Sequence, residues 1–320
     1  MHRLHVGPTE IQTMKTNRYI PVLALALFSL LQSCQKTSVK EETLKDNESE
    51  LVAHSEDQTM VSAEMEAITN EANVPLDKDL AAGVQEPSIC SATLTYENSG
   101  GFKKVIINYN GADCSGFRSR SGIVIISMAS SLHWKDTGTA ITVTYQDLKI
   151  TRLSDKKSIT INGSHTLTNV GGGLLVNLLF GRPTIVHALN SNNMSITFDD
   201  GSKRIWQIAR QRVYTMANGG TITITGTHQE GARSNIAEWG TDRFGNVFTT
   251  SITEPLIISG SCQYRLVSGK ILHEIASRSA TVTFGLDAQG QAVSCPQGNF
   301  YFRLAWTGPL GNTLTYIGAY

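Results

Sequence analysis

The chain has 320 residues, of which 40% are hydrophobic and 17% charged, and its 27 basic residues balance its 27 acidic residues. This length suits one large β domain or two smaller domains, with enough apolar residues for a sizeable core. The basic residues form no run, which argues against a nucleic-acid partner.

The first segment has the pattern of a bacterial lipoprotein signal. A basic start at residues 14–18 precedes the apolar stretch Ile20–Leu31. That stretch is too short to span a bilayer, which needs about 20 residues. Leu31-Gln32-Ser33-Cys34 then resembles a lipobox, so we predict a signal peptide over 1–33 and a lipid on Cys34. Alternatives are a secretory signal with a chance cysteine and an uncleaved anchor.

Residues 35–86 carry 13 acids against four lysines, and this segment contains no aromatic residue. Such a composition is typical of disordered chains, because little apolar surface is available to offset the entropy of ordering. We therefore predict an acidic disordered tether over 34–87, with at most a transient helix over residues 61–72. A partner-binding acidic segment is the alternative.

From residue 88 to 320 the composition changes to threonine, isoleucine, valine, glycine and aromatic residues. Apolar residues alternate with threonine in several short runs, and Asn/Asp-Gly turns separate them. These features predict an all-β domain: an antiparallel meander closed as a sandwich, roll or barrel. The alternating runs are residues 141–145, 159–161, 196–198, 221–224 and 281–284.

Two other runs do not alternate. Residues 123–126 are apolar throughout and predict a central strand with both faces covered, and residues 174–180, apolar except for Asn177, fit either a strand or a short helix. A weak repeat relates residues 159–165 to 222–228, and the cysteines recur at similar places among the strands. Two related halves are therefore a further prediction.

The five cysteines divide into one and four. With Cys34 taken by lipid, four remain in an oxidising compartment, and three pairings are open. We favour Cys90–Cys114 and Cys262–Cys295, each of which closes a short loop. A four-thiolate metal site is the rival, but the sequence has no C-x-x-C pair, and we predict no metal.

No catalytic motif or cofactor motif stands out. His165 and His228 occupy matched places in the repeat and could meet over a pocket if their strands were neighbours. Trp206 is a third candidate ligand-facing residue, although aromatic residues in strands more often belong to the core. His273 and Glu274 face opposite sides of one strand and cannot cooperate. The arginines near Trp206, predicted to form a structural cation–π ladder, are Arg204, Arg210 and Arg212.

The order of these features resembles a group of uncharacterised Bacteroidota exported lipoproteins with an all-β domain. The resemblance runs over most of residues 90–306 and implies no activity. One departure is Pro296-Gln297 after the last cysteine, where that group tends to have acidic or Asn-rich residues. The segments that carry the resemblance are residues 114–122, 161–169, 200–210, 224–227 and 255–262.

These observations support three hypotheses about function. The first is a lipid-anchored, non-catalytic binding or structural module of the cell envelope. The second is a hydrolase acting on glycans or envelope polymers, and the third is a carrier of apolar ligands inside a β-roll. The expected partners are the membrane, through the lipid, and a glycan or envelope protein. Because Gln35 and not Asp follows Cys34, we expect the outer membrane, on either face.

Overall fold

The computed structural model describes residues 38–76, 89–114, 116–275, 278–296, 298–308, 311 and 313–320. The chain divides into two compact units, Met1–Asp46 and Asn47–Tyr320. The contacts described below lie within Asn47–Tyr320. The predicted signal peptide and Cys34 lie outside the described residues.

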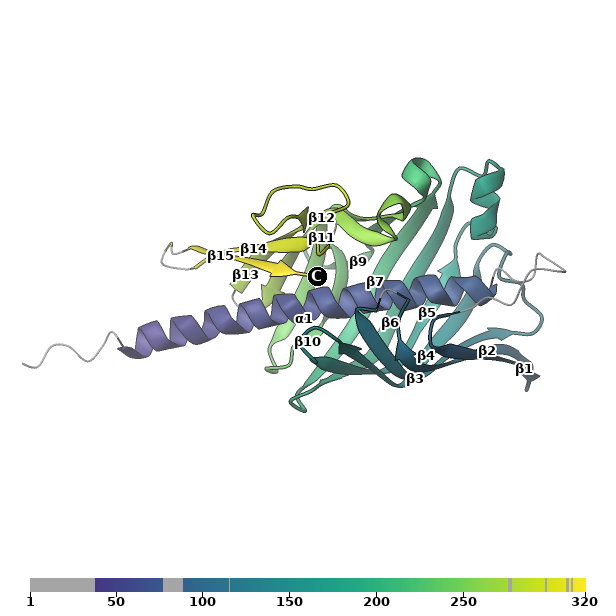
Figure 1. Ribbon diagram of the computed structural model, residues 1–320, viewed down its shortest axis with the longest axis horizontal. Coiled ribbons are helices and arrows are strands. Elements are labelled where there is room, and N and C mark those ends of the chain that lie inside the picture. The colour runs from purple at the N-terminus through teal and green to yellow at the C-terminus, as the bar shows by residue number, and fades with distance from the viewer. Residues whose placement is uncertain are drawn as a thin grey trace, which may run out of the picture. The chain divides into compact units, whose positions relative to one another are not determined.

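The described strands form one antiparallel sheet in which almost every strand pairs with the next along the chain (Figure 1). The predicted all-β meander is therefore confirmed. The strands are β1 (Ala92–Ser99), β2 (Phe102–Ala112), β3 (Arg118–Ala129), β4 (Thr139–Arg152), β5 (Ser158–Asn169), β6 (Ile185–Phe198), β7 (Lys203–Thr215), β8 (Thr221–Gly226), β9 (His228–Glu230), β10 (Arg233–Thr241), β11 (Val247–Ser259), β12 (Arg265–Ile275), β13 (Arg278–Leu286), β14 (Tyr301–Thr307) and β15 (Thr313–Ala319).

The meander changes its pattern once, at β7. The first half of β7 pairs with β10 and its second half pairs with β8, while β8 also pairs with β11. Gly226 ends β8 where the chain passes against the backbone of Asn235, and a side chain at this position would collide with it. Three short 3₁₀ helices lie in connecting loops: η2 (Leu175–Phe180), η3 (Ala217–Gly219) and η4 (Gly260–Cys262).

Side chains alternate between the two faces of the sheet. Isoleucine, valine and aromatic residues point to the inner face, whereas threonine and other polar residues point outward. Val124 and Ile126 are buried, but Ile123 and Ile125 are only half-buried. The prediction that residues 123–126 have both faces covered is therefore wrong, because no second layer packs on the outer face of β3 in the described part of the chain.

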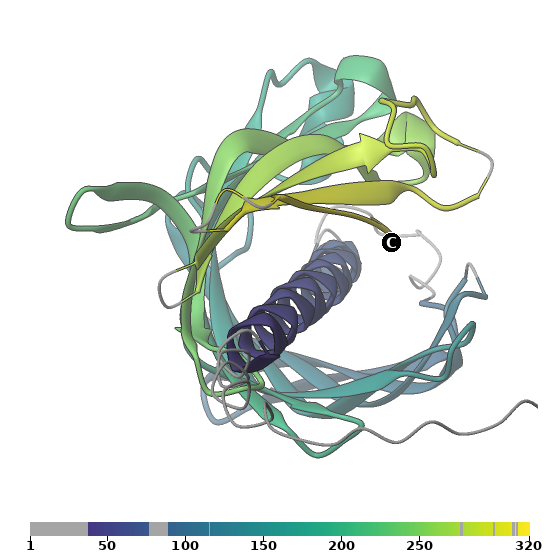
Figure 2. The ribbon, with the colours of Figure 1, turned by 90° about the vertical axis from the view of Figure 1, so that its left-hand side faces the viewer.

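The sheet curves strongly around its inner face (Figure 2). Register shifts interrupt the pairing of β3 with β4, of β4 with β5, of β5 with β6 and of β6 with β7, and such bulges increase local twist and bending. Gly122 has a positive φ and lies against the backbone of Asp147 at one of these shifts, so no larger residue fits there. Among the described residues β1 pairs only with β2 and β15 only with β14, which leaves two sheet edges.

A long helix occupies much of the predicted tether. Helix α1 spans Ser38–Leu76, and from Asn47 onward it lies inside the curve of the sheet (Figure 2). The prediction of disorder over 34–87 is wrong for these residues, because their carboxylates find buried arginine partners on the sheet. Residues 34–37 and 77–87 lie outside the described residues.

Two disulfides join Cys90 to Cys114 and Cys262 to Cys295, with Cα–Cα distances of 5.2 and 5.1 Å. Both predicted pairs are confirmed. Each bond encloses a hairpin, β1–β2 in the first case and β12–β13 in the second, so the two hairpins have equivalent topology. The other repeat is less regular, because residues 159–165 lie within β5 whereas residues 222–228 pass from β8 into β9.

Candidate functional site

From Asn47 onward α1 lies inside the curve of the sheet. Every residue from Glu50 to Glu71 is buried or half-buried, and eight of the twelve buried ones are polar or charged. Between residues 47 and 76 the helix carries seven acids and no lysine or arginine. Buried charges are costly unless they are paired, so the helix requires basic partners on the sheet.

Five arginines on the inner face of the sheet supply these partners. Three of them lie on β7 at even positions, on the side that also carries Trp206 and Tyr214, and two lie on β3. Four of the five are almost fully buried, and Arg118 is half-buried. We call them the inner arginines: Arg118, Arg120, Arg204, Arg210 and Arg212.

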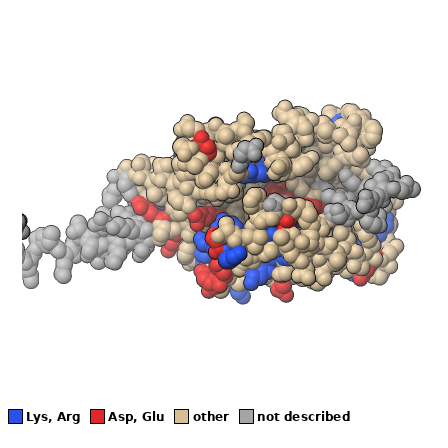
Figure 3. Space-filling model, in the orientation of Figure 1, with Lys and Arg blue, Asp and Glu red and all other residues tan. Residues whose placement is uncertain are grey.

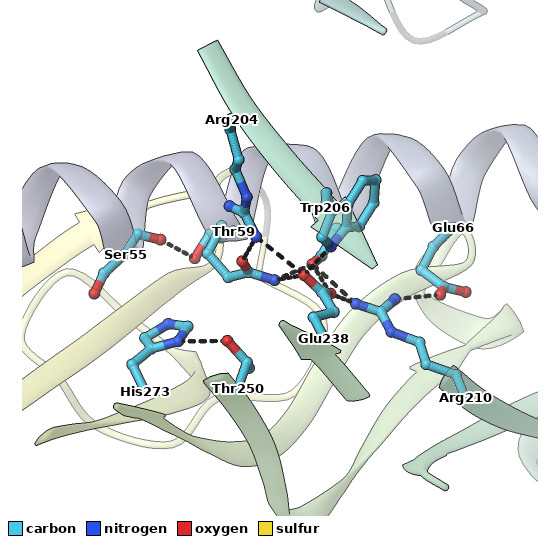
Figure 4. A network of polar contacts seen from close by, with 11 residues as sticks. Ser55, Thr59, Glu66, Arg204, Trp206, Arg210, Glu238, Thr250 and His273 are labelled. Carbon is cyan, nitrogen blue, oxygen red and sulfur yellow. Dashed lines mark hydrogen bonds and ion pairs between the residues drawn. The ribbon is translucent and has the colours of Figure 1, made fainter. Parts of the chain in front are cut away.

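Glu238 of β10 is the centre of the contacts (Figure 4). Its carboxylate accepts hydrogen bonds from Trp206 Nε1 at 2.6 Å and from Ser62 Oγ at 2.9 Å. Arg204 Nη2 lies 3.3 Å from Oε2, and Arg210 Nη2 pairs with Oε1. The side-chain amide of Gln58 also donates to Glu238, so α1 contributes two of these partners. This carboxylate therefore joins two inner arginines to the helix.

The helix itself provides three further carboxylates to the inner arginines. Glu66 lies 2.9 Å from Arg210 Nη1 and 3.0 Å from Arg212 Nη2. Glu64 pairs with Arg118 and lies 3.4 Å from Arg120. Glu71 lies 2.6 Å from Arg120 Nη1 and accepts a hydrogen bond from the Tyr109 hydroxyl at 2.7 Å. The positive inner face and the acidic helix thus neutralise each other.

Contacts outside this centre also involve acids of the helix. Arg243 binds Asp57 through two nitrogens at 2.6 and 2.7 Å, and Tyr316 of β15 donates to Glu56. Burial raises the pKa of Asp57 to about 6, and the bond to Arg243 opposes this shift. Since Tyr109 lies on β2 and Tyr316 on β15, the helix is bound near both edges of the sheet. On the face shown in Figure 3, acidic and basic side chains lie beside one another.

Some buried nitrogen atoms of the inner arginines have no hydrogen-bond partner among the described residues. They are Nε of Arg120 and Arg210, and Nε and Nη1 of Arg204 and of Arg212. Burial also lowers the pKa of the Arg204 and Arg210 guanidinium groups, which reflects the cost of holding these charges away from water. The hollow therefore retains unused capacity to bind an anion or a polar group.

A cavity of about 930 Å³ lies between α1 and the sheet, bordered mainly by strands from β7 to β13 and also by Arg118 of β3. This volume falls within the usual range of small-molecule sites. The polar and charged residues that line it include Ser62, Glu66, Arg118, Arg210, Glu238 and Arg265. The other lining residues are mainly apolar and include Ile224, Ile252, Leu256, Ile271, Phe284 and Phe300.

The structure does not bring the two predicted histidines together. His165 lies on β5, where its Nδ1 is 3.3 Å from the Tyr145 hydroxyl, and burial lowers its pKa to about 3. His228 lies on β9, and its ring stacks on Trp239 with centroids 4.1 Å apart. Strands β5 and β9 do not pair, so the condition for a shared pocket is not met.

Trp206 is fully buried and binds Glu238, and it does not line the cavity. Of the predicted cation–π ladder, Arg204 lies 5.7 Å from the Trp206 ring centroid. Arg212 lies 5.3 Å from the Tyr214 ring centroid, and Arg210 and Arg212 both also bind Glu66.

His273 and Glu274 face opposite sides of β12, as predicted. His273 is buried, accepts or donates a bond with Thr250 Oγ1 at 2.9 Å, and lies beside His54 of the helix. Burial lowers the pKa of His273 to about 3, and Arg204 lowers it further. Glu274 lies on the outer face and binds Arg233. Burial lowers the pKa of both His54 and His273, so both rings are neutral near pH 7 and are weak bases.

Sequence reasoning missed the inner arginines as a site. The available signal was their position: Arg204, Arg210 and Arg212 share the inner face of one strand with Trp206 and Tyr214. Charged residues on an inward face require a buried partner, and the acidic segment was the part of the chain able to supply one.

Comparison with known proteins finds no match: no family model, no curated protein and no solved structure is significantly similar to this chain. The described residues contain no group of three or more histidine, cysteine, aspartate or glutamate side chains arranged to hold a metal. No described helix is both long and apolar enough to cross a membrane.

Proposed function

We propose that this protein is a lipid-anchored, non-catalytic binding module of the cell envelope that holds an apolar ligand beside α1. The observation that carries this proposal is the cavity of about 930 Å³, whose lining is mainly aliphatic and aromatic with several polar and charged side chains. Ligand sites are usually concave and mostly apolar, with a few polar groups that fix orientation.

The state of the carboxylates supports binding rather than catalysis. Glu66 and Glu238 line the cavity, but arginines bind both of them. A general acid or base must lie within hydrogen-bond reach of the proton that it transfers, and the oxygens of both carboxylates already contact guanidinium groups. No observation favours the glycan-hydrolase hypothesis over this one.

The lipid anchor rests on the sequence. The apolar stretch before Cys34, the lipobox and Gln35 lead us to propose an outer-membrane location. Two disulfides fit a chain that folds outside the reducing cytoplasm. The resemblance to Bacteroidota lipoproteins agrees with this location.

The binding proposal is tested with a neutral fluorescent probe, the methyl ester of 11-(dansylamino)undecanoic acid. The full chain carries Cys34→Ala so that neither lipid nor detergent competes. We expect saturable binding with a blue-shifted emission, and we expect Ile252→Trp to weaken it at least tenfold, because Ile252 lines the cavity. Thr253→Trp is the matched control, since Thr253 is exposed and adjacent in sequence.

Two outcomes would contradict the proposal. One is the absence of saturable binding in a folded protein, which would favour a purely structural module. The other is equal weakening by Ile252→Trp and Thr253→Trp, which would place the probe outside the cavity.

A further inference from the structure

The hollow carries a large positive charge when the helix is left out. The sheet supplies five inner arginines, and Glu238 is the sheet carboxylate that pairs with them. Five positive charges and one negative charge give a net charge of +4 for this set. The helix offsets three of these four charges through Glu64, Glu66 and Glu71, which leaves a net charge of +1. The inner face is therefore built to hold anions, and in this state α1 provides them.

The composition of α1 suits a helix that can leave the hollow when another anion binds there. Of its twelve buried residues between Glu50 and Glu71, four are apolar and eight are polar or charged, so most of the surface that the helix exposes on leaving the sheet is polar. A permanent core helix gains more from apolar packing than from buried ion pairs, which roughly balance their own desolvation cost. The polar contacts are therefore better suited to exchange with another anion than to maximal stability.

The cavity lies next to the ion pairs between the inner arginines and the helix. Arg118 and Arg210 belong to the inner arginines and also line the cavity, next to Glu66. Arg210 is almost fully buried, and its Nε has no hydrogen-bond partner among the described residues. A ligand with an apolar tail in the cavity thus places its end group where Glu64 and Glu66 meet the arginines.

We propose that the inner arginines form a subsite for the anionic end of an amphiphile, and that Glu64 and Glu66 of α1 occupy this subsite until the ligand replaces them. This inference rests on the proposed binding function and specifies its ligand as an alkyl carboxylate or alkyl phosphate. Binding of such a ligand loosens α1 from the sheet.

The test compares 11-(dansylamino)undecanoic acid with its methyl ester, because the two probes differ only in the charged end. In the full chain carrying Cys34→Ala we expect the acid to bind at least tenfold more tightly than the ester. Glu66→Gln should raise the affinity for the acid severalfold, since it removes a competing carboxylate. Arg118→Met should lower affinity for the acid and leave the ester unaffected. Glu56→Gln is the matched control on the same helix, because Glu56 binds Tyr316 and does not line the cavity.

A second measurement needs no variant at the site. Hydrogen exchange of amides in residues 54–70 should accelerate at least tenfold when the acid saturates the protein, but not when the ester does. Decyl phosphate should act like the acid, and inorganic phosphate alone should have no effect. Equal action of inorganic phosphate would overturn the assignment to an amphiphile.

The outcomes separate this inference from the proposed function. If acid and ester bind with equal affinity and Glu66→Gln changes neither, the cavity binds apolar ligands but the anionic subsite is wrong. Unchanged exchange of α1 with bound acid would refute the replacement of Glu64 and Glu66. If neither probe binds, the proposed function itself fails.

Discussion

Glu238→Gln is the substitution that tests the buried charge network most directly. Glu238 is fully buried, and its carboxylate contacts Arg204 and Arg210 together with Trp206 and Ser62. The change keeps the shape of the side chain but leaves two buried guanidinium groups with one counter-charge fewer. Removing one partner of a buried ion pair typically costs about 3–5 kcal/mol.

The assay is urea unfolding followed by circular dichroism, with thermal unfolding as a second measurement. In a unit of this size about 3–5 kcal/mol corresponds to a Tm decrease of roughly 6–20 °C. The matched control is Glu274→Gln, because Glu274 binds Arg233 on the outer face, where both side chains contact solvent. An exposed pair contributes at most about 1 kcal/mol, so this control should change little.

A double variant determines whether the loss comes from the network. In a protein that already carries Glu238→Gln, Arg210→Met should lower the unfolding free energy by clearly less than it does in the unchanged protein. The reason is that Glu238→Gln has already removed a partner of Arg210. The reasoning fails if Glu238→Gln destabilises the protein no more than Glu274→Gln does. It also fails if the two losses at Glu238 and Arg210 are simply additive.

Three further predictions concern the disulfides, the histidines and the anchor. Replacing Cys262 and Cys295 by alanine together should lower the unfolding free energy by about 3–4 kcal/mol, measured by urea unfolding, and four titratable thiols in the unreduced protein would contradict the pairing. The unfolding free energy should fall as the pH decreases from 6.5 towards about 3, because the unfolded chain binds protons on histidines that stay neutral in the folded protein. Urea unfolding at several pH values measures this slope. The slope is at most about 1.4 kcal/mol per pH unit for each histidine. Asp57, whose pKa is about 6, has the opposite effect, but it contributes one proton against four. A flat profile would show that these histidines are accessible: His54, His165, His187 and His273. Cys34→Ala should move the protein from the membrane to the soluble fraction, and unchanged membrane association would refute the anchor.

The strands were predictable because each strand has one face towards the hollow and one face towards the outside. In β4 and β5 isoleucine and valine face the hollow while threonine faces outward, and this contrast is visible as period-two alternation. The disulfides were predictable for a related reason, since each cysteine pair flanks a hairpin of consecutive strands. Both features depend on short-range order along the chain.

Helix α1 was not predictable from its own sequence. The buried side of α1 is mostly polar, and a mostly polar helix is usually solvated or unstable unless a partner elsewhere in the chain covers it. The predicted ladder placed Arg204, Arg210 and Arg212 near Trp206, but Glu66, which pairs with Arg210 and Arg212, lies more than 140 positions earlier. Neither segment alone indicates the contact, because the pairing depends on the curvature of the sheet.

The distribution of charge along the chain relates the acidic helix segment to the basic sheet. Residues 35–86 have 13 acids and four lysines, a net charge of −9, and residues 87–320 have 20 basic and 13 acidic residues, a net charge of +7. Each imbalance alone suggests a solvated surface, but the whole chain is neutral. Glu66 with Arg210 and Glu64 with Arg120 show that part of this neutrality arises from direct pairing inside the hollow. Opposite imbalances in two segments of a neutral chain therefore indicate intramolecular binding, and they also define what could compete with it: another anion.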